Sequence, residues 1–487
     1  MTARLACTMG SPMRGKIPWM LLAGFAIAGL PLYFAYATLQ LEWHDHGSVY
    51  VKLQNMFSHG LQAKVHFAPF LYVLAALVQP TNSLLFFLAL HVAALVLGAY
   101  ALFLITRDGT ASESTAALLF FAFLANPYAV AANLYTHYDI FMVPALLFFY
   151  LFMSKERLPA AVACLVLALT IKEDVWLYAS SLILSRARRL SGPRLALLLG
   201  LTAGYAVFAT GWLFPYLYPQ REDAFALLYT QGATKWGVFL YLVTHPWSTG
   251  AKLLTGPGLG FLSSILFLPL FAPLRSLFAL PVFYLWLNST SPARNSLAFY
   301  YSIPSLILFA PVLPHALLNV RSLLLKRVAG RPAAMALVHR WSLPLAAGLL
   351  LLTSLVRNVA LPDGLELSPS LQSVFADERR FGEGYHEHHR VGWDILTNRI
   401  PRGRSVITHF TLGTYVAPAH QTYLFFKDGD DFQSGKLEPD YVLYDLKSRF
   451  PLLGPRRMEE IHEWMLTNRQ YVLVYSKDGY FLYQRRG

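Results

Sequence analysis

The stretch LPAAVACLVLALTIKEDVWLYASSLILSRARR, residues 158–189, decides how this chain is built. Two apolar runs flank three consecutive charged residues, Lys172, Glu173 and Asp174, and basic residues stand at both ends of the stretch. A single membrane span would place one basic end outside the cell, although basic loops tend to stay in the cytoplasm. A hairpin of two short helices keeps both basic ends inside. The pattern therefore predicts a membrane hairpin that carries the three charges at its outer tip.

The composition of the whole chain is that of a polytopic membrane protein. Hydrophobic residues make up 55% of the 487 positions, charged residues make up only 14%, and the mean hydropathy is +0.43. A soluble protein of this length needs more polar surface. The apolar runs 17–39 and 83–105 exceed the roughly 20 residues that cross a hydrocarbon core. The first run is too long for a signal peptide, so we expect it to remain as a span.

The net charge of +13 reflects membrane topology rather than nucleic-acid binding, because the basic residues gather in short loops. These clusters are Arg14 and Lys16; Lys155 and Arg157; Arg186, Arg188, Arg189 and Arg194; and Arg321, Lys326, Arg327, Arg331 and Arg340. The two cysteines, Cys7 and Cys164, provide neither a disulfide framework nor a thiolate zinc site.

With every basic cluster in the cytoplasm, the chain is predicted to cross the cytoplasmic (inner) membrane about 11 times from a cytoplasmic N-terminus. The expected spans are 17–39, 82–106, 113–130, 139–153, the two arms of 158–185, 193–214, 257–273, 276–288, 299–318 and 341–357. Residues 66–80 and 236–252 are expected to form short interfacial segments. These elements make up a predicted transmembrane domain, 1–361, with an outer loop at 40–65.

Residues 362–487 have a different character, because charge density rises and the apolar runs shrink to the length of strands. The predicted strands are 405–409, 441–446, 471–476 and 480–485, and the predicted amphipathic helices are 386–399 and 455–468. Lys477, Asp478 and Gly479 form a tight turn between the last two strands. This part is expected to be a small soluble α/β domain on the extracytoplasmic side.

The threaded topology places the unusual polar residues of the apolar part on the outer side. They are Glu42, His44, Asp45, His46, His66, His137, Asp139, Lys172, Glu173, Asp174, Asn288, Arg294 and Asn295. Ionisable groups at membrane depth are costly unless they are paired or hydrated, so they mark candidate functional sites. A bundle without a site would scatter such residues over both faces.

Several of these residues also have a purely structural interpretation. Asp45 could cap a helix at 48–58, and His66, before Pro69, could simply precede a helix. His137 and Asp139 could stabilise a loop. His44 and His46 suit headgroup contacts better than metal ligation. Arg294 could be a phosphate clamp or a headgroup anchor. The motif HEHHR (386–390) suits a solvated helix face better than a zinc site. Lys172–Asp174 is hardest to explain structurally, because charges between half-helices are costly.

The sequence lacks the common nucleotide-binding and hydrolase motifs, including GxxxxGK[ST], GxGxxG, HExxH and GxSxG. A high-energy donor used on the outer face must be available outside the cytoplasm. Lipid-linked phosphosugars meet this condition, and a site at the bilayer surface is where a polyprenyl-phosphate headgroup would lie.

Four segments in this order, DHGSVYVKLQNMFSHG, HFAPFLYVLAALVQP, FFAFLANPYAVAANLYTHYD and LALTIKED, resemble the bacterial and archaeal membrane family known as domain of unknown function 2079. The family pattern corresponds to Asp45 with Gly47, His66 with Pro69, and Lys172–Asp174. Residues 288–304 and the segment ending at 446 also resemble it. In the second loop, where family members commonly carry an aromatic-x-His pattern, this chain has Thr136-His137-Tyr138-Asp139. The family layout is similar to that of GT-C type glycosyltransferases, whose first-loop aspartate is commonly catalytic and whose donor is a polyprenyl-phosphate sugar.

This resemblance implies glycosyl transfer on the outer face, with Asp45 as general base and with Lys172 and Arg294 holding the donor phosphate. The remaining candidates have secondary roles: Glu173, Asp174 or Asp139 would position hydroxyls or a divalent cation, and His66 and His137 would contact substrate. The expected partners are a polyprenyl-phosphate sugar lipid and a sugar, lipid or protein acceptor, without nucleic acid. A transporter or lipid flippase that uses the same charges as an ion relay is the alternative, and a non-catalytic assembly factor is a third hypothesis.

Overall fold

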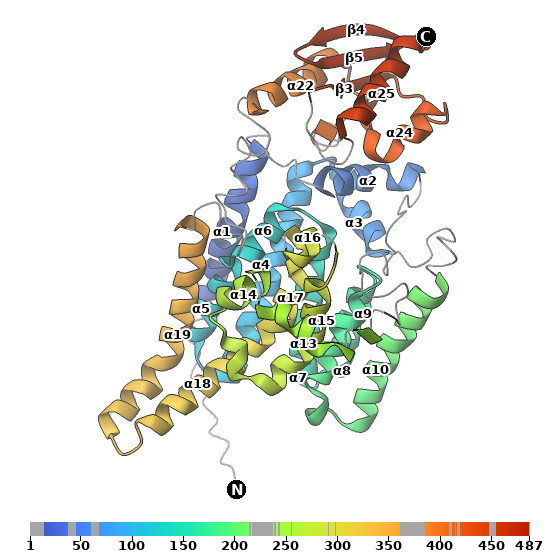
Figure 1. Ribbon diagram of the computed structural model, residues 1–487. Helices are drawn as coiled ribbons and strands as arrows, with labels where there is room; N and C mark the ends of the chain where they lie inside the picture. Colours follow the sequence, from blue (N-terminus) through green and yellow to red (C-terminus); the bar gives the residue numbers. More distant parts are fainter. Residues whose placement is uncertain are drawn as a thin grey trace.

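The computed structural model shows a helical bundle with a small β-sheet at one end (Figure 1). It describes residues 14–37, 45–59, 68–213, 216, 237, 240–241, 244–254, 256–290, 292–297, 299–360, 385–408, 412–413, 415, 419–447 and 454–486. The sheet and the connection between α18 (Leu313–Arg327) and α19 (Pro332–Ala360) lie at opposite ends of the molecule (Figure 1).

The predicted hairpin at 158–185 is confirmed. Its two arms are α8 (Leu158–Leu169) and α9 (Val175–Leu184), and the three charged residues lie between them. The guanidinium of Arg186, just after α9, lies 5.6 Å from the ring of Tyr150, close to the end of α7 (Met142–Ser154). Because α7 leads directly into α8, both basic ends of the hairpin lie at the same end of the bundle.

Within the described residues, five helical segments are long and apolar enough to span a membrane, and a bent pair brings the total to six. The five are α1 (Ile17–Ala37), α4 (Leu84–Thr110), Gly192–Leu213, Tyr300–Arg327 and α19 (Pro332–Ala360). Gly192–Leu213 contains α10 (Gly192–Ala206) and a π-helical end, and Tyr300–Arg327 contains α17 (Ile303–Phe309) and α18 (Leu313–Arg327). The other expected spans are shorter apolar helices, so the membrane character is confirmed and the count of about 11 is not.

Two expected spans are interrupted by local backbone chemistry. The segment predicted at 113–130 bends by 50° between α5 (Glu113–Leu124) and α6 (Pro127–Leu134). Pro127 has no N–H to continue the first helix, and the Asn126 side chain caps the second by accepting from the Tyr128 amide.

The span expected at 257–273 is wrong. Helix α14 (Gly256–Ser264) stops after two turns, and α15 (Pro273–Leu287) starts a separate helix. Leu266 and Phe267 between them have φ of 54° and 52°, which a continuous α-helix excludes. Of the expected interfacial segment 236–252, the structure describes only parts, including α13 (Pro246–Gly250).

The C-terminal part is a three-layer α/β domain. Its strands are β1 (Ser405–Thr408), β2 (Gln421–Leu424), β3 (Tyr441–Asp445), β4 (Tyr471–Lys477) and β5 (Tyr480–Arg485), in the order β2-β1-β3-β5-β4. Strands β1, β2 and β3 are parallel, and β5 is antiparallel to both neighbours. Four strands were predicted correctly, whereas β2 was missed because it is four residues long and is set by pairing with β1.

Alternating side chains of the sheet face two different cores. Val406 and Leu443 pack with α22 (Tyr385–Arg399), whereas Ile407 and Val442 face the other side. That side is covered by α24 (Phe425–Gln433) and α25 (Gly454–Thr467). The period-two alternation of a strand produces these two faces.

The sheet domain contacts the bundle through α2 (Asp45–His59) and α1. The Asn55 side-chain amide donates to the Thr422 carbonyl of β2 at 2.7 Å. The rings of Tyr36 and Tyr415 lie 6.0 Å apart, and Tyr415 also contacts Trp393 of α22 at 5.6 Å. These contacts fix the first segment after α1 against the C-terminal domain.

The predicted turn between β4 and β5 is confirmed as a two-residue hairpin. Lys477 pairs with Tyr480, and Asp478 and Gly479 between them have φ of 52° and 89°. Positive φ at both central residues defines a type I′ turn, which favours glycine at the second position. The turn presents the Asp478 carboxylate toward α22.

The HEHHR motif on α22 was expected to lie on a solvated helix face, but two of its histidines contact the sheet domain or are buried. His388 contacts Asp445 Oδ2 through Nε2 at 2.8 Å and Asp478 Oδ2 through Nδ1 at 2.9 Å, and its neighbour His389 is buried. Lys447 contacts the other oxygen of Asp478. The histidine therefore joins α22 to the sheet and its hairpin turn.

The carboxylate partners of His388 make this contact between α22 and the sheet sensitive to pH. Partial burial lowers the pKa of His388, but hydrogen bonds to Asp445 and Asp478 outweigh burial and raise the pKa above its ordinary value. Hydrogen bonds from Lys447 and His388 lower the pKa of Asp478 to about 2. A histidine whose pKa is higher in the folded than in the unfolded protein stabilises the fold while it is protonated. This stabilisation is complete below the pKa of the unfolded state, about 6.5, and disappears as the pH rises through the pKa of the folded state.

We expect β3 and β5 of the full-length protein to lose hydrogen-exchange protection between about pH 6 and about pH 9, after correction for intrinsic exchange. The variant His388→Gln should show a much smaller change, because it has no proton to lose in this range. Equal changes in both proteins would show that His388 does not carry the effect.

Candidate functional site

A buried ion pair lies at the tip of the hairpin. Lys172 Nζ is 2.9 Å from Asp139 Oδ2, and the two residues are 3% and 2% exposed. Asp139 lies in the short helix η3 (Tyr138–Phe141), between α6 and α7. A buried charge is strongly disfavoured unless an opposite charge and hydrogen bonds compensate it. The pair therefore holds two breaks in the helical bundle against each other.

Asp174 provides a second carboxylate close to Lys172. Its Oδ2 accepts a hydrogen bond from the Tyr178 hydroxyl at 2.8 Å and lies 4.0 Å from Lys172 Nζ. Its Oδ1 is buried and accepts no hydrogen bond within the described residues. Two carboxylates thus face one ammonium group, and an acceptor oxygen remains available for a bound hydroxyl.

His137 packs against the ion pair from the other side. The Asp139 backbone amide donates to His137 Nδ1 at 3.3 Å, and the same Nδ1 is 3.1 Å from Asp139 Oδ1. The neutral imidazole accepts from the amide, whereas a protonated imidazole can donate to the carboxylate. The His137 ring stacks on Tyr300 at 3.9 Å, with an angle of 10° between the rings.

Arg294 reaches the cluster through two tyrosines. Its guanidinium lies 5.2 Å from the Tyr301 ring and 5.0 Å from the Trp286 ring. The hydroxyls of Tyr300 and Tyr301 are 3.1 Å apart, and Lys172 Nζ lies 5.9 Å from the Tyr300 ring. Arg294, in the short helix α16 (Pro292–Asn295), is less buried than Lys172. It is thus the more accessible cation of the site.

The hairpin tip is also joined to α3 (Phe70–Val78). The Phe70 amide donates to the Thr170 carbonyl at 2.9 Å, and the Phe70 and Phe141 rings are 5.1 Å apart. The Gln79 side chain, after α3, donates to the carbonyls of Leu53 and Gln54 at 2.8 Å. The cluster therefore lies at the end of the bundle that carries α2 and the sheet domain.

The structure brings together five of the predicted site residues: His137, Asp139, Lys172, Asp174 and, through the tyrosines, Arg294. Glu173 is half-buried beside them. His44 and His66 lie outside the described residues, as does the side chain of Asp45, the first residue of α2. Whether Asp45 meets the cluster stays a prediction.

The aromatic residues of the site were not predicted from the sequence. They are Tyr178, Trp286, Tyr300 and Tyr301. Aromatic residues are frequent throughout this chain, so no local signal separated these four from lipid-facing ones. The described residues contain no group of three or more histidine, cysteine, aspartate or glutamate side chains placed to hold a metal, and the divalent cation stays a prediction.

The family model for predicted membrane proteins of domain of unknown function 2079 (DUF2079) matches residues 45–482. The chain belongs to this family. The match begins at the first residue of α2 and includes every residue of the cluster. No curated protein sequence matches this DUF2079 member.

One similar solved structure is that of ArnT from Cupriavidus metallidurans bound to undecaprenyl phosphate. The two chains are 14% identical, the alignment covers 96% of the DUF2079 protein and 98% of ArnT, and the TM-score is 0.53. At this identity the likeness establishes a shared fold. It agrees with the predicted architecture of an apolar helical bundle followed by a small α/β domain.

Removing the cation of the buried pair should destabilise the protein strongly. We expect Lys172→Met to lower the free energy of unfolding by about 3–5 kcal/mol, because Asp139 would be left buried and unpaired. Titration with sodium dodecyl sulfate in mixed micelles measures this change.

The matched control is Lys155→Met. Lys155 pairs with Asp108 at 2.7 Å, but both side chains are about one-third exposed, so its loss should cost under about 1 kcal/mol. If the two variants were equally stable, the Lys172–Asp139 pair would not be the structural anchor described above.

Proposed function

We propose that this DUF2079 protein transfers a sugar from a polyprenyl-phosphate donor to an acceptor, on the membrane face that carries the sheet domain. The observation that carries the proposal is the fold shared with a protein bound to undecaprenyl phosphate over nearly the whole length of both chains. The buried Lys172–Asp139–Asp174 cluster at the same end as the sheet domain supports it, since charged groups within an apolar bundle mark functional sites.

The site geometry refines the proposed roles. Lys172 already has Asp139 as its counter-ion, so its charge mainly orients that carboxylate. Arg294 lies on aromatic faces and is more accessible, so it is the proposed ligand of the donor phosphate. Positive charge at this position would stabilise the leaving phosphate.

The carboxylates would contact the sugar and the acceptor. Asp174 Oδ1, which lacks a described hydrogen-bond donor, is suited to accept from a sugar hydroxyl. Glu173, Asp139, His137 and His66 would complete the polar surface. Asp45 is the proposed general base, taking the proton of the acceptor hydroxyl as that oxygen attacks the anomeric carbon.

A transporter or lipid flippase is the second candidate function. His91 of α4 is fully buried and lies within electrostatic range of His137. A buried histidine near an ion pair could relay protons through the membrane. This candidate predicts movement of a substrate without a new glycosidic bond.

The purified protein in nanodiscs should release undecaprenyl phosphate from undecaprenyl-phosphate sugars when an acceptor is present, measured by mass spectrometry. We expect Arg294→Ala to lower kcat/KM by roughly 10–100-fold, as the loss of a charge-assisted contact implies. Asp45→Asn should lower the rate by roughly 100–10,000-fold if it removes the general base.

Arg340→Ala is the matched control, because Arg340 also lies over a tryptophan ring, at 5.2 Å from Trp341, but is exposed on α19. It should retain native activity. Full activity of Asp45→Asn would exclude Asp45 as the base. Lipid movement in proteoliposomes that depends on Lys172, without sugar transfer, would favour the flippase.

A further inference from the structure

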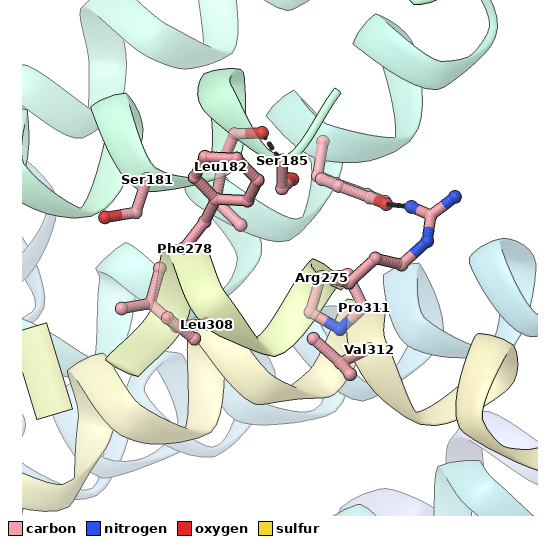
Figure 2. Close-up of a pocket in the computed structure, with 10 residues that line it drawn as sticks. Ser181, Leu182, Ser185, Arg275, Phe278, Leu308, Pro311 and Val312 are labelled. Carbon is pink, nitrogen blue, oxygen red and sulfur yellow. Dashed lines mark hydrogen bonds between the residues drawn. The ribbon is translucent and has the colours of Figure 1, made fainter. Parts of the chain in front are cut away.

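A pocket lies at the opposite end of the bundle from the Lys172 cluster. Figure 2 shows residues that line this pocket. It is lined by hydroxyl, apolar and basic side chains, among them Tyr150, Ser181, Ser185, Arg275, Leu308 and Val312. Tyr150 lies in the last turns of α7, whose first residue follows η3, and Ser185 follows the end of α9, whose first residue follows Asp174. The pocket is therefore separated from the Lys172 cluster by the length of these helices.

Two guanidinium groups lie beside Tyr150: Arg275, which lines the pocket, and Arg186, which follows the lining residue Ser185 in the chain. Arg275 Nη1 donates to the Tyr150 hydroxyl at 3.3 Å, and Arg186 lies 5.6 Å from the centre of the Tyr150 ring. Arg186 is only 8% exposed, and Arg275 is half-buried. Arg189 and His315 are within electrostatic range of Arg275. The pocket thus concentrates positive charge in a partly desolvated place.

These cations lack anionic partners. Within the described part of the chain, no carboxylate forms an ion pair with Arg186, Arg189 or Arg275. Two other basic residues at this end do have carboxylate partners: Lys155 pairs with Asp108 at 2.7 Å, and Arg194 pairs with Glu156 at 2.7 Å. The tendency of basic residues to remain in cytoplasmic loops explains basic residues that are exposed or paired. It does not explain basic residues that are buried and have no carboxylate partner.

We propose that this pocket binds a phosphate-bearing anion, held between Arg186 and Arg275. Paired guanidinium groups match the geometry of phosphate oxygens. The Tyr150 hydroxyl accepts from Arg275, and within the described residues its own proton has no acceptor, so it can donate to the same anion. Leu308, Val312 and Phe278 are apolar residues that line the same pocket as Arg275 (Figure 2). A phospholipid headgroup and a free phosphate share this chemistry.

Native mass spectrometry of the full-length protein tests the proposal. The protein released from detergent would be titrated with phosphatidylglycerol, with phosphatidylcholine, and separately with inorganic phosphate. We expect a tightly bound phosphatidylglycerol or phosphate in the native protein, and at least a roughly 10-fold weaker affinity in Arg186→Ala and Arg275→Gln, the effect of losing one charge-assisted contact. Retention of phosphatidylglycerol alone would identify a lipid, and retention of inorganic phosphate would identify a soluble anion.

The matched control is Arg188→Ala, which removes an exposed arginine from the same loop and should bind like the native protein. Arg186→Lys keeps the charge and should bind better than Arg186→Ala, which separates loss of binding from loss of folding. The proposal is overturned if Arg186→Ala, Arg275→Gln and Arg188→Ala all bind like the native protein, or if all three lose affinity equally.

Discussion

The buried contact between Lys172 and Asp139 is the interaction on which the arrangement of this bundle depends. It joins residues 33 positions apart, one between α8 and α9 and the other between α6 and α7. Neither charge could remain at this depth alone, because desolvation would outweigh the stability gained from packing. The two helix breaks are therefore kept together, and the groups around them, His137, Asp174 and Tyr178, acquire fixed positions.

The two ends of the bundle differ in which charged groups are buried there. At the Lys172 end, carboxylates outnumber the deeply buried cation, and an acceptor oxygen of Asp174 remains available. At the Arg275 end, guanidinium groups gather around Tyr150 without a carboxylate among the described residues. A site rich in acceptors suits sugar hydroxyls, whereas a site rich in donors suits a phosphate. The two ends of the bundle thus differ in the charge of their buried polar groups.

The C-terminal domain contributes to the site indirectly. Its strand β2 receives the Asn55 side-chain amide, and Tyr415 packs against Tyr36 at the end of α1. Through Gln79, the same helix α2 is bonded to the end of α3, which contacts the hairpin tip. A chain of short contacts therefore runs from the sheet to the Lys172 cluster. Such an arrangement gives the sheet domain a physical route by which to position α2, the helix that begins at Asp45.

The sequence by itself determined the membrane character, the hairpin at 158–185 and most of the small α/β domain. These features depend on local patterns: apolar run length, charge between two apolar runs, strand alternation and the Asp478–Gly479 turn. It did not determine strand β2, because pairing with β1 sets that conformation, and it did not reveal the break at Leu266 and Phe267, where two consecutive residues other than glycine adopt positive φ. Tertiary structure alone decided that Lys172 meets Asp139, that Arg294 rests on Tyr301, and that Arg186 and Arg275 share Tyr150. The reason is physical: sequence shows which charges are costly to bury, whereas only packing selects the partner that compensates each one.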